Sequence, residues 1–489
     1  MNAKSVTIDS GSSSFVLTGG TLIVENELNI EGGALNAGGT ADGLIVSNGG
    51  NVNGGGAVTL GANTQWLSEF TQRRDFSVYS GNVTVQDGAS ISVDSGTTAV
   101  GRGLGNVGSV LVTGLGSEFS NSGQHGEFLV GFEGGSGQLN VQNGGQVFSG
   151  NPLIGGSATI GYGVGSTGQV TVSGAGSNWT SGGVGVGYLN GTGILTVEDH
   201  GSLNTSYLGV RAGSSVTVDN ASIDATQGGE RRVELVDGGS LQASNNSNVN
   251  VNHVSIDGAG SKATFDHSTL TAESLDLTNG AFFKATLSTI NITGNTTTID
   301  ATSQMILNGG TYDEAGDFII YEKLTGTNPI INIGSDLIIN NGGSVEFSGL
   351  ASLLIGDDLL FFGDPGTSYL GLTTITMQGL LDDDSNGFQF DLGSAFLGTL
   401  NLGKLIVDAV ELILTGNFNI SELILPGTAT IRLADNSTLT VNRFTGDENS
   451  ITGGTFHNNT PAVPEPTTLL LFGMGLLGLL GFRRFRKIG

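Results

Sequence analysis

The acidic stretch at 382–387 is the part of the sequence whose residue types and spacing best match a metal site. Asp382, Asp384, Asn386 and Gly387 have the D-x-D-x-N-G spacing that opens a calcium-binding loop. The twelfth position of such a loop needs a bidentate glutamate, and this chain has Gly393 there. The stretch therefore predicts an acidic surface turn, with a partial calcium site as the alternative. No other metal or cofactor is expected.

Two glycine-rich stretches, 103–108 and 163–168, match the G-x-G-x-x-G spacing of dinucleotide-binding loops. Each is followed by a strand pattern instead of a helix, and both recur at one place in a repeat, so they predict corner glycines. The chain has no cysteine, which excludes thiol catalysis and thiolate metal sites. The five histidines show no ligand spacing. His200 stands where an earlier repeat has Gly144, which predicts a solvated turn.

Gly356, Asp357 and Asp358 resemble one element of the polygalacturonase signature, but that family's Gly-His-Gly turn and Arg-Ile-Lys segment are missing. Lyases that act on anionic polymers need arginine or lysine in the groove, and the body carries only 13 of the 17 basic residues. We therefore expect a protein that is not an enzyme. The alternatives are a carbohydrate-active β-helix enzyme (a polysaccharide lyase or a glycoside hydrolase) and a carbohydrate-binding solenoid.

Composition indicates the kind of body that must position these residues. The 489 residues include 84 glycines and are 37% hydrophobic but only 12% charged. Such a chain is too apolar for simple disorder, and its glycines have no Gly-X-Y period, which excludes collagen. Many short strands joined by tight turns fit best. The net charge of −27 predicts repulsion from nucleic acid and from anionic membrane surfaces, so no nucleic-acid partner is expected.

Internal repeats organise the middle of the chain. Copies begin at residues 100, 130, 160 and 184, and each reads roughly apolar-Gly-aromatic, a glycine-rich turn, a V-x-V strand, then Gly-x-Gly-Ser and often an aromatic residue. In Leu139-Asn140-Val141 the apolar pair points to one face and the polar residue to the other. An apolar face of this size must stack on a neighbouring copy, which is the condition for a solenoid. Phe119 and Trp179, at equivalent positions, are expected in one column.

The repeats resemble the passenger-type repeats shared by autotransporters and PEP-CTERM proteins, most clearly in VSGAGSNW at 172–179. This resemblance implies an all-β fold, an elongated right-handed parallel β-helix (β-solenoid). From 241 to 460 the glycine content falls, yet short strands with Asn-Gly or Gly turns continue. We interpret that part as a less regular continuation of the solenoid. Antiparallel sandwich repeats are the alternative, because strand alternation alone does not distinguish the two.

The last 29 residues form a three-part tail. It begins with the triplet Pro464, Glu465 and Pro466, which ends the preceding sheet because proline cannot donate ladder hydrogen bonds. The uncharged segment 467–482 comes next and predicts a short hydrophobic helix that spans the membrane. The terminal basic cluster consists of Arg483, Arg484, Arg486 and Lys487. Basic residues favour the cytoplasmic side, so the body is expected outside.

In order and spacing this tail resembles the PEP-CTERM family of sorting signals. The resemblance implies processing by an exosortase, inner-membrane anchoring before processing, and a final location at the cell surface or in the extracellular matrix. The family is typical of Gram-negative bacteria that make exopolysaccharide, which implies an association with exopolysaccharide or biofilm. The family normally begins with a secretory signal peptide, and the N-terminus MNAKSVTIDSGSSSF has no apolar h-region. Three explanations remain: a start codon assigned too far downstream, which we favour, a sequence that is that of the mature form, or an unusual route of export.

The sequence thus predicts four parts. Residues 1–98 form N-terminal solenoid rungs or a cap, 99–240 the glycine-rich repeats, 241–460 the less regular continuation, and 461–489 the sorting tail. The expected function is that of an exported structural or adhesive protein.

Overall fold

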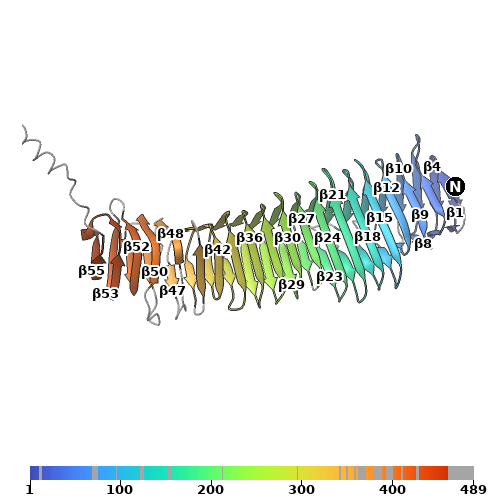
Figure 1. Cartoon of the computed structure of the whole chain (residues 1–489). Helices are drawn as coiled ribbons and strands as arrows, with labels where there is room; N and C mark the ends of the chain where they lie inside the picture. Colours follow the sequence, from blue (N-terminus) through green and yellow to red (C-terminus); the bar gives the residue numbers. More distant parts are fainter. Residues whose placement is uncertain are drawn as a thin grey trace, which may run out of the picture.

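The computed structural model describes residues 1–460 apart from 10–13, 69–74, 95, 122–125, 151–156, 212, 295, 341–342, 349–350, 357–358, 362–369, 379–387, 392–399, 409–410 and 426–428. These residues form a long, gently curved rod of stacked strands, with β1 (Asn2–Ala3) at one end and β55 (Ile451–Asn458) at the other (Figure 1). The helical content of the described residues is one 3₁₀ turn, Glu448–Ser450.

Each turn of the rod supplies three strands, one to each of three parallel ladders. One turn consists of β14 (Thr98–Arg102), β15 (Val107–Thr113) and β16 (Glu118–Asn121). The next consists of β17 (Glu127–Phe132), β18 (Ser136–Gln142) and β19 (Gln146–Ser149), which pair in parallel with their predecessors. We call the ladders that contain β14, β15 and β16 the first, second and third ladders.

The same three-strand pattern continues through the rungs that matter below. The first ladder adds β20 (Ser157–Tyr162), β23 (Val184–Tyr188), β26 (Tyr207–Val210), β29 (Arg232–Val236), β32 (His253–Asp257) and β35 (Ser274–Thr278). The second adds β21 (Thr167–Ser173), β24 (Thr192–Glu198), β27 (Ser215–Asp219), β30 (Ser240–Ser244), β33 (Lys262–Asp266) and β36 (Phe282–Thr286). The third adds β22 (Asn178–Ser181), β25 (Ser202–Asn204), β28 (Ser222–Ala225), β31 (Asn248–Val251), β34 (Thr269–Ala272) and β37 (Thr289–Ile292).

The core is a set of side-chain columns that run along the rod. Val110, Leu139, Val170 and Leu195 are in register on consecutive strands of the second ladder, and none is exposed. Their neighbours along each strand point outward, as the period of two requires. The predicted stacking of apolar faces is therefore confirmed, and a single turn has no core of its own.

Phe119 and Trp179 lie in one buried column of the third ladder, with Val147 between them. The Trp179 indole N–H donates to the Ser149 hydroxyl of the preceding turn at 2.8 Å. Trp66 repeats this contact with Ser47, also at 2.8 Å. The predicted column is confirmed, and it carries a polar contact that satisfies the buried indole donor.

The G-x-G-x-x-G stretches are corners, as expected. Stretch 103–108 links β14 to β15, and Gly103 and Gly105 have φ of 91° and 76°. The glycine one residue before the end of the first-ladder strands β14, β17 and β20 is required for space as well. At Gly131 (φ 76°), a Cβ atom would collide with the backbone carbonyl oxygen of Thr167 on the next turn. Only glycine allows this conformation and this approach together.

The serine of each Gly-x-Gly-Ser corner holds neighbouring turns together. The Ser117 hydroxyl accepts a hydrogen bond from the Gly88 N–H at 3.0 Å, and Ser177 accepts from Gly144 at 3.0 Å. Ser261 accepts from Gly238 at 2.9 Å. Each serine is buried and satisfies a backbone donor that the tight corner leaves without a ladder partner.

The described strands beyond residue 240 continue the parallel ladders, so the alternative of antiparallel sandwich repeats is wrong. The second ladder ends at β45 (Ser344–Ser348), after which the rungs have longer strands such as β50 (Leu400–Asp408) and β53 (Thr430–Val441). β53 pairs with both β51 (Glu411–Thr415) and β52 (Asn417–Ile424), which joins the first and third ladders. The four-part division of the chain remains a prediction.

Candidate functional site: an aromatic groove on the first ladder

Four outward-facing residues stand in one register on consecutive strands of the first ladder. They are Arg102, Phe132, Tyr162 and Tyr188. All four are half-buried, and the Phe132 and Tyr162 ring centroids are 5.6 Å apart. Parallel pairing places one such side chain on each turn, so the rings form a column along the rod.

Glycines beneath two tyrosines let their rings lie close to the sheet. A Cβ atom at Gly185 would come within 2.7 Å of the Tyr188 ring, and one at Gly209 would collide with the Tyr207 hydroxyl. Both rings therefore cover backbone of their own strand. The glycines explain why large aromatic side chains are only partly exposed on an outer face.

The two tyrosines join a hydrogen-bonded charged cluster at one end of the column. The Tyr207 hydroxyl donates to Glu234 Oε2 at 2.6 Å. Arg211 Nη2 donates to the Tyr188 hydroxyl at 3.2 Å, and its guanidinium carbon lies 4.4 Å from the Tyr188 ring centroid. The Glu234 carboxylate also lies 3.9 Å from Arg211 and 3.5 Å from Arg232. Cation–π contact and charge-assisted hydrogen bonds fix both tyrosines in place.

The electrostatics of this cluster favour binding over proton transfer. Burial and the hydrogen bond to Glu234 raise the pKa of the Tyr207 hydroxyl well above its ordinary value. The hydrogen bond to Tyr188 raises the pKa of Arg211. Tyr207 therefore stays protonated and serves as a hydrogen-bond donor, whereas a catalytic base would need a lowered pKa.

Arg102 closes the other end of the column. Its guanidinium pairs with Asp75 at 3.0 Å and with Glu133 at 3.1 Å. The same group lies 5.4 Å from the Phe132 ring centroid and 5.9 Å from that of Tyr79. Each end of the aromatic column thus has an arginine whose charge is already compensated by carboxylates.

Between these ends the surface is hollowed into a cavity of about 560 Å³, which we call the aromatic groove. Aromatic rings, hydroxyl groups, glycines and carboxylates line it. The lining comprises Glu127, Leu129, Phe132, Ser157, Ala158, Thr159, Tyr162, Gly182, Gly183, Gly185, Tyr188, Leu189, Ser206, Tyr207 and Glu230. Pockets that combine aromatic walls with a few polar groups are typical of sites for small polar molecules with apolar faces.

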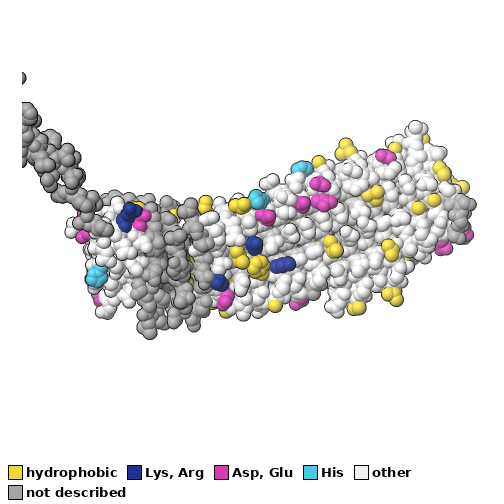
Figure 2. Space-filling view, in the orientation of Figure 1, with side chains coloured by type: hydrophobic (Ala, Val, Ile, Leu, Met, Phe, Trp, Pro, Cys, Tyr) yellow, Lys and Arg dark blue, Asp and Glu magenta, His cyan; other side chains and the backbone are white. Residues whose placement is uncertain are grey.

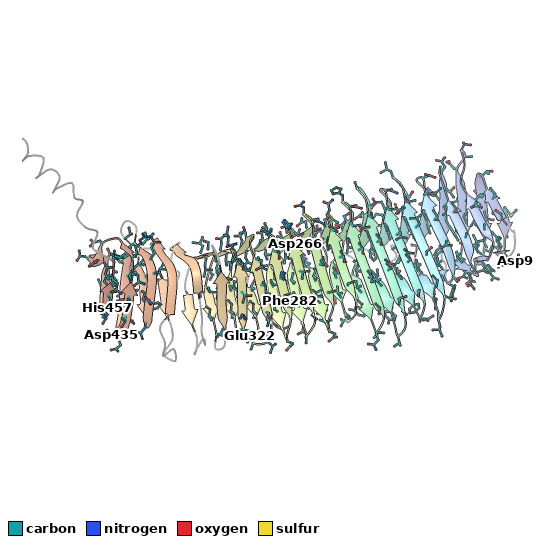
Figure 3. All side chains as sticks on the ribbon, viewed as in Figure 1. Asp9, Asp266, Phe282, Glu322, Asp435 and His457 are labelled. Carbon is teal, nitrogen blue, oxygen red and sulfur yellow. The ribbon has the colours of Figure 1, made fainter. Side chains whose placement is uncertain are left out.

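The histidines and acidic residues form no second site within the described part of the chain. No group of three His, Asp or Glu side chains there is placed to hold a metal ion. His200 is exposed at a corner with φ of 68°, which confirms its predicted place in a solvated turn. Asp266, which pairs with His267 at 2.8 Å, is near the middle of the rod, and His457 is near its C-terminal end (Figure 3).

Comparison with protein families identifies the segment that comes after the rod. Residues 462–487 match the family model described as the PEP-CTERM protein-sorting motif. The chain carries a PEP-CTERM sorting motif. This confirms the predicted resemblance of the tail, and a PEP-CTERM motif implies exosortase-dependent export of the body that precedes it.

A crystal structure described as the TibC-catalyzed hyper-glycosylated TibA55-350 fragment is similar to the solenoid that precedes the PEP-CTERM motif. The identity is 16% and the TM-score 0.29, over 75% of this chain and 98% of that one. No curated protein sequence matches the chain.

The residues that sequence reasoning singled out within and near the PEP-CTERM motif lie outside the described part of the structure. This holds for the triplet Pro464, Glu465 and Pro466, for the hydrophobic segment 467–482, and for the basic cluster Arg483, Arg484, Arg486 and Lys487. It also holds for the calcium candidate Asp382, Asp384 and Asn386 and for Asp357 and Asp358. Among the described residues, no helix is long and apolar enough to cross a membrane.

The aromatic groove was missed at the sequence level, although a signal for it existed. The repeat consensus has an aromatic residue after the corner glycine, as in Phe132, Tyr162 and Tyr188. Alternation on a parallel ladder places that position on the outer face, where an aromatic residue is unusual. Tyr207, Arg211 and Glu234 fit no repeat consensus and had no comparable signal.

Proposed function

We propose that this protein is a non-enzymatic structural or adhesive rod, exported and sorted by an exosortase, that associates with exopolysaccharide in the cell-surface or biofilm matrix. The observation that carries the proposal is the PEP-CTERM motif at the end of a long parallel β-solenoid. The motif supplies the route out of the cell. The rod supplies an extended surface on which every turn presents side chains at a regular spacing.

The surface of the rod supports an extracellular role. Most of the visible face carries neither charged nor hydrophobic side chains (Figure 2). Acidic residues outnumber basic ones, 44 to 17, which favours solubility of a large secreted β-protein. A non-enzymatic role is supported by the aromatic groove, because its Tyr207 hydroxyl is engaged as a donor to Glu234 and the arginines at the two ends of the column are paired with carboxylates.

The finer features of this proposal come from the tail and from the resemblance. Segment 467–482 is proposed to cross the inner membrane as a helix until the tail is processed, with the basic cluster on the cytoplasmic side. The solenoid is proposed to be right-handed, the sense that crossover connections between parallel strands favour.

The sorting step can be tested in a host that encodes an exosortase. Pro464→Ala combined with Pro466→Ala should retain the protein in the inner-membrane fraction and reduce the surface and matrix fractions at least tenfold. Pro461→Ala, which lies just outside the matched residues, is the control and should leave sorting unchanged. Equal surface yield for both variants would contradict exosortase-dependent sorting.

The non-enzymatic part needs its own experiment. Full-length protein purified in detergent is incubated with a panel of neutral and acidic polysaccharides, and reducing ends and unsaturated uronates are measured. No turnover is expected. Turnover of any member would replace the proposal with the carbohydrate-active enzyme.

A further inference from the structure

We propose that the aromatic groove binds a neutral glycan chain laid along the rod axis, with its sugar rings stacked on Phe132 and Tyr162. This deepens the proposed function by naming a ligand class and a site, and it rests on that function for its extracellular setting. Binding itself is a property of the folded rod and can be tested separately.

The arrangement of the rings indicates a linear ligand. Phe132 and Tyr162 are 5.6 Å apart on consecutive turns, and Tyr188 continues the register on the next turn. A polymer of flat rings that runs parallel to the rod axis can place successive rings over successive aromatic side chains. The C–H face of a pyranose is apolar and packs on an aromatic face in the same way as other apolar groups do.

The polar lining suits hydroxyl groups. Ser157 and Thr159 on β20 line the groove with their hydroxyl groups. Glu127 and Glu230 also line it, and both side chains are exposed. Within the described residues, neither carboxylate has a salt-bridge or hydrogen-bond partner. A carboxylate accepts hydrogen bonds only, so its natural ligand is a group that donates, such as a sugar hydroxyl.

Charge decides between a neutral and an acidic glycan. The arginines at the two ends are engaged, Arg102 by Asp75 and Glu133, and Arg211 by Glu234. The carboxylates of Glu127 and Glu230 would repel uronates or sulfates, and the whole chain carries −27. The groove therefore favours a glycan without charge.

A second outward-facing aromatic residue, Phe282, supplies the contrast. Phe282 on β36 is half-buried, pairs in register with Lys262, and has Lys284 two residues further along its strand. Dark-blue side chains lie beside a hydrophobic cluster at this place on the visible face (Figures 2 and 3). An acidic glycan would prefer this basic patch, so Phe282 serves as a matched control.

The experiment measures binding of full-length protein in detergent to cellohexaose, mannohexaose and hexagalacturonate by calorimetry. A neutral hexasaccharide should bind, and Tyr162→Ala combined with Phe132→Ala should weaken it at least tenfold. Phe282→Ala should leave the affinity unchanged. Glu127→Gln should weaken neutral binding several-fold through the lost acceptor charge, without affecting the stability of the rod. Circular dichroism melting of each variant checks that the solenoid is intact.

Three results would overturn the inference. One is the absence of binding to both neutral hexasaccharides. Another is equal affinity of the wild type and the Phe132/Tyr162 double variant. The third is selective binding of hexagalacturonate that is lost in Lys262→Ala/Lys284→Ala, which would move the site to the basic patch. Each leaves the sorting experiment untouched, and a failure of sorting with intact binding would reject the proposed function alone.

Discussion

The glycine-rich turns between β14 and β24 and the compact turns between β32 and β43 (Ile330–Ile333) build the same three ladders with different corners. Between β15 and β16 the corner has four residues, 114–117, whereas between β33 and β34 it has two, His267 and Ser268. Between β34 and β35 only Glu273 intervenes. Residues paired in register are accordingly 32 apart at Val147 and Trp179 but 19 apart at Asp313 and Asn332.

The difference shows what the longer corners provide. In the glycine-rich turns the corner residues stand away from the ladders, and Leu104, Leu115 and Val164 are more than 75% exposed at their tips. Most of the lining of the aromatic groove comes from this region, and the Tyr188 ring there lies close over Gly185. The compact turns contribute no residue to the lining of this groove. Their distinctive feature is internal, a carboxyl group in the core.

That carboxyl group belongs to Glu314 on β40 (Thr311–Glu314), which is 2% exposed and stands in register with Ile292 and Ile333. The Thr297 hydroxyl is hydrogen-bonded to it, and the Gly316 N–H donates to its second oxygen at 3.1 Å. Burial raises the pKa of Glu314 from the ordinary 4.5 to about 7.

The largest loss of stability is expected at the glycine corners, which distinguish the glycine-rich turns from the compact ones. Gly131→Ala should destabilise the rod by about 4 kcal/mol or more, because the methyl group meets the Thr167 carbonyl oxygen. Gly165→Ala is the control, with φ of 75° against 76° and no atom within 4 Å of the added Cβ. It should cost only about 1–2 kcal/mol, the price of the left-handed conformation. Urea denaturation midpoints measure both, and equal shifts would show that conformation, not space, selects glycine.

The next largest effect is the pH dependence of the compact turns. The pKa of Glu314 is raised in the folded state. Its contribution to folding stability is therefore complete below pH 4.5 and is lost as the pH rises through about 7. The loss amounts to roughly 3 kcal/mol, since one pKa unit corresponds to about 1.4 kcal/mol. Glu314→Gln should remove this part of the pH dependence. Denaturation of the wild type and of Glu314→Gln at pH 5 and at pH 8 measures this effect. An equal change of unfolding free energy with pH in both proteins would contradict the prediction.

A smaller effect is expected where the tryptophans are anchored. Ser149→Ala leaves the buried Trp179 indole N–H without an acceptor and should cost about 1–3 kcal/mol. Ser149→Ala combined with Trp179→Phe removes donor and acceptor together and separates this penalty from the loss of packing. A full double-mutant cycle, followed by thermal melting, should give a coupling energy near 1 kcal/mol. Strict additivity would mean that the hydrogen bond contributes nothing.

The smallest effect is expected at the corner serines, which both regions have. Ser177→Ala in the glycine-rich turns and Ser261→Ala in the compact ones each remove an acceptor for a corner N–H. Both should cost about 1 kcal/mol, because the local geometry is the same. Hydrogen exchange at Gly144 and Gly238 reports each corner directly. A clear difference between the two sites would show that corner length changes the role of the serine.

Much of the fold could be predicted from particular residues. The alternation in Leu139-Asn140-Val141 set which side chains point inward, and the recurrence of Gly-x-Gly-Ser placed the corners before strands. The candidate site could not be predicted in the same way. Phe132, Tyr162 and Tyr188 were visible as part of a repeat, but Tyr207 and Glu234 come from turns with no matching consensus. These residues come into contact because the number of residues in each corner sets the register between successive turns.

The sequence by itself determined the strand period, the repeat and the PEP-CTERM motif, because each of these is carried by residues close together in the chain. Only the tertiary structure decided which residues from different turns share a column. The register brings Tyr188 beside Arg211 and Tyr207 beside Glu234, and it places Glu314 between two isoleucines. In a parallel solenoid the partner of a side chain is set by the length of an entire turn, and corners of variable length hide that distance from local sequence.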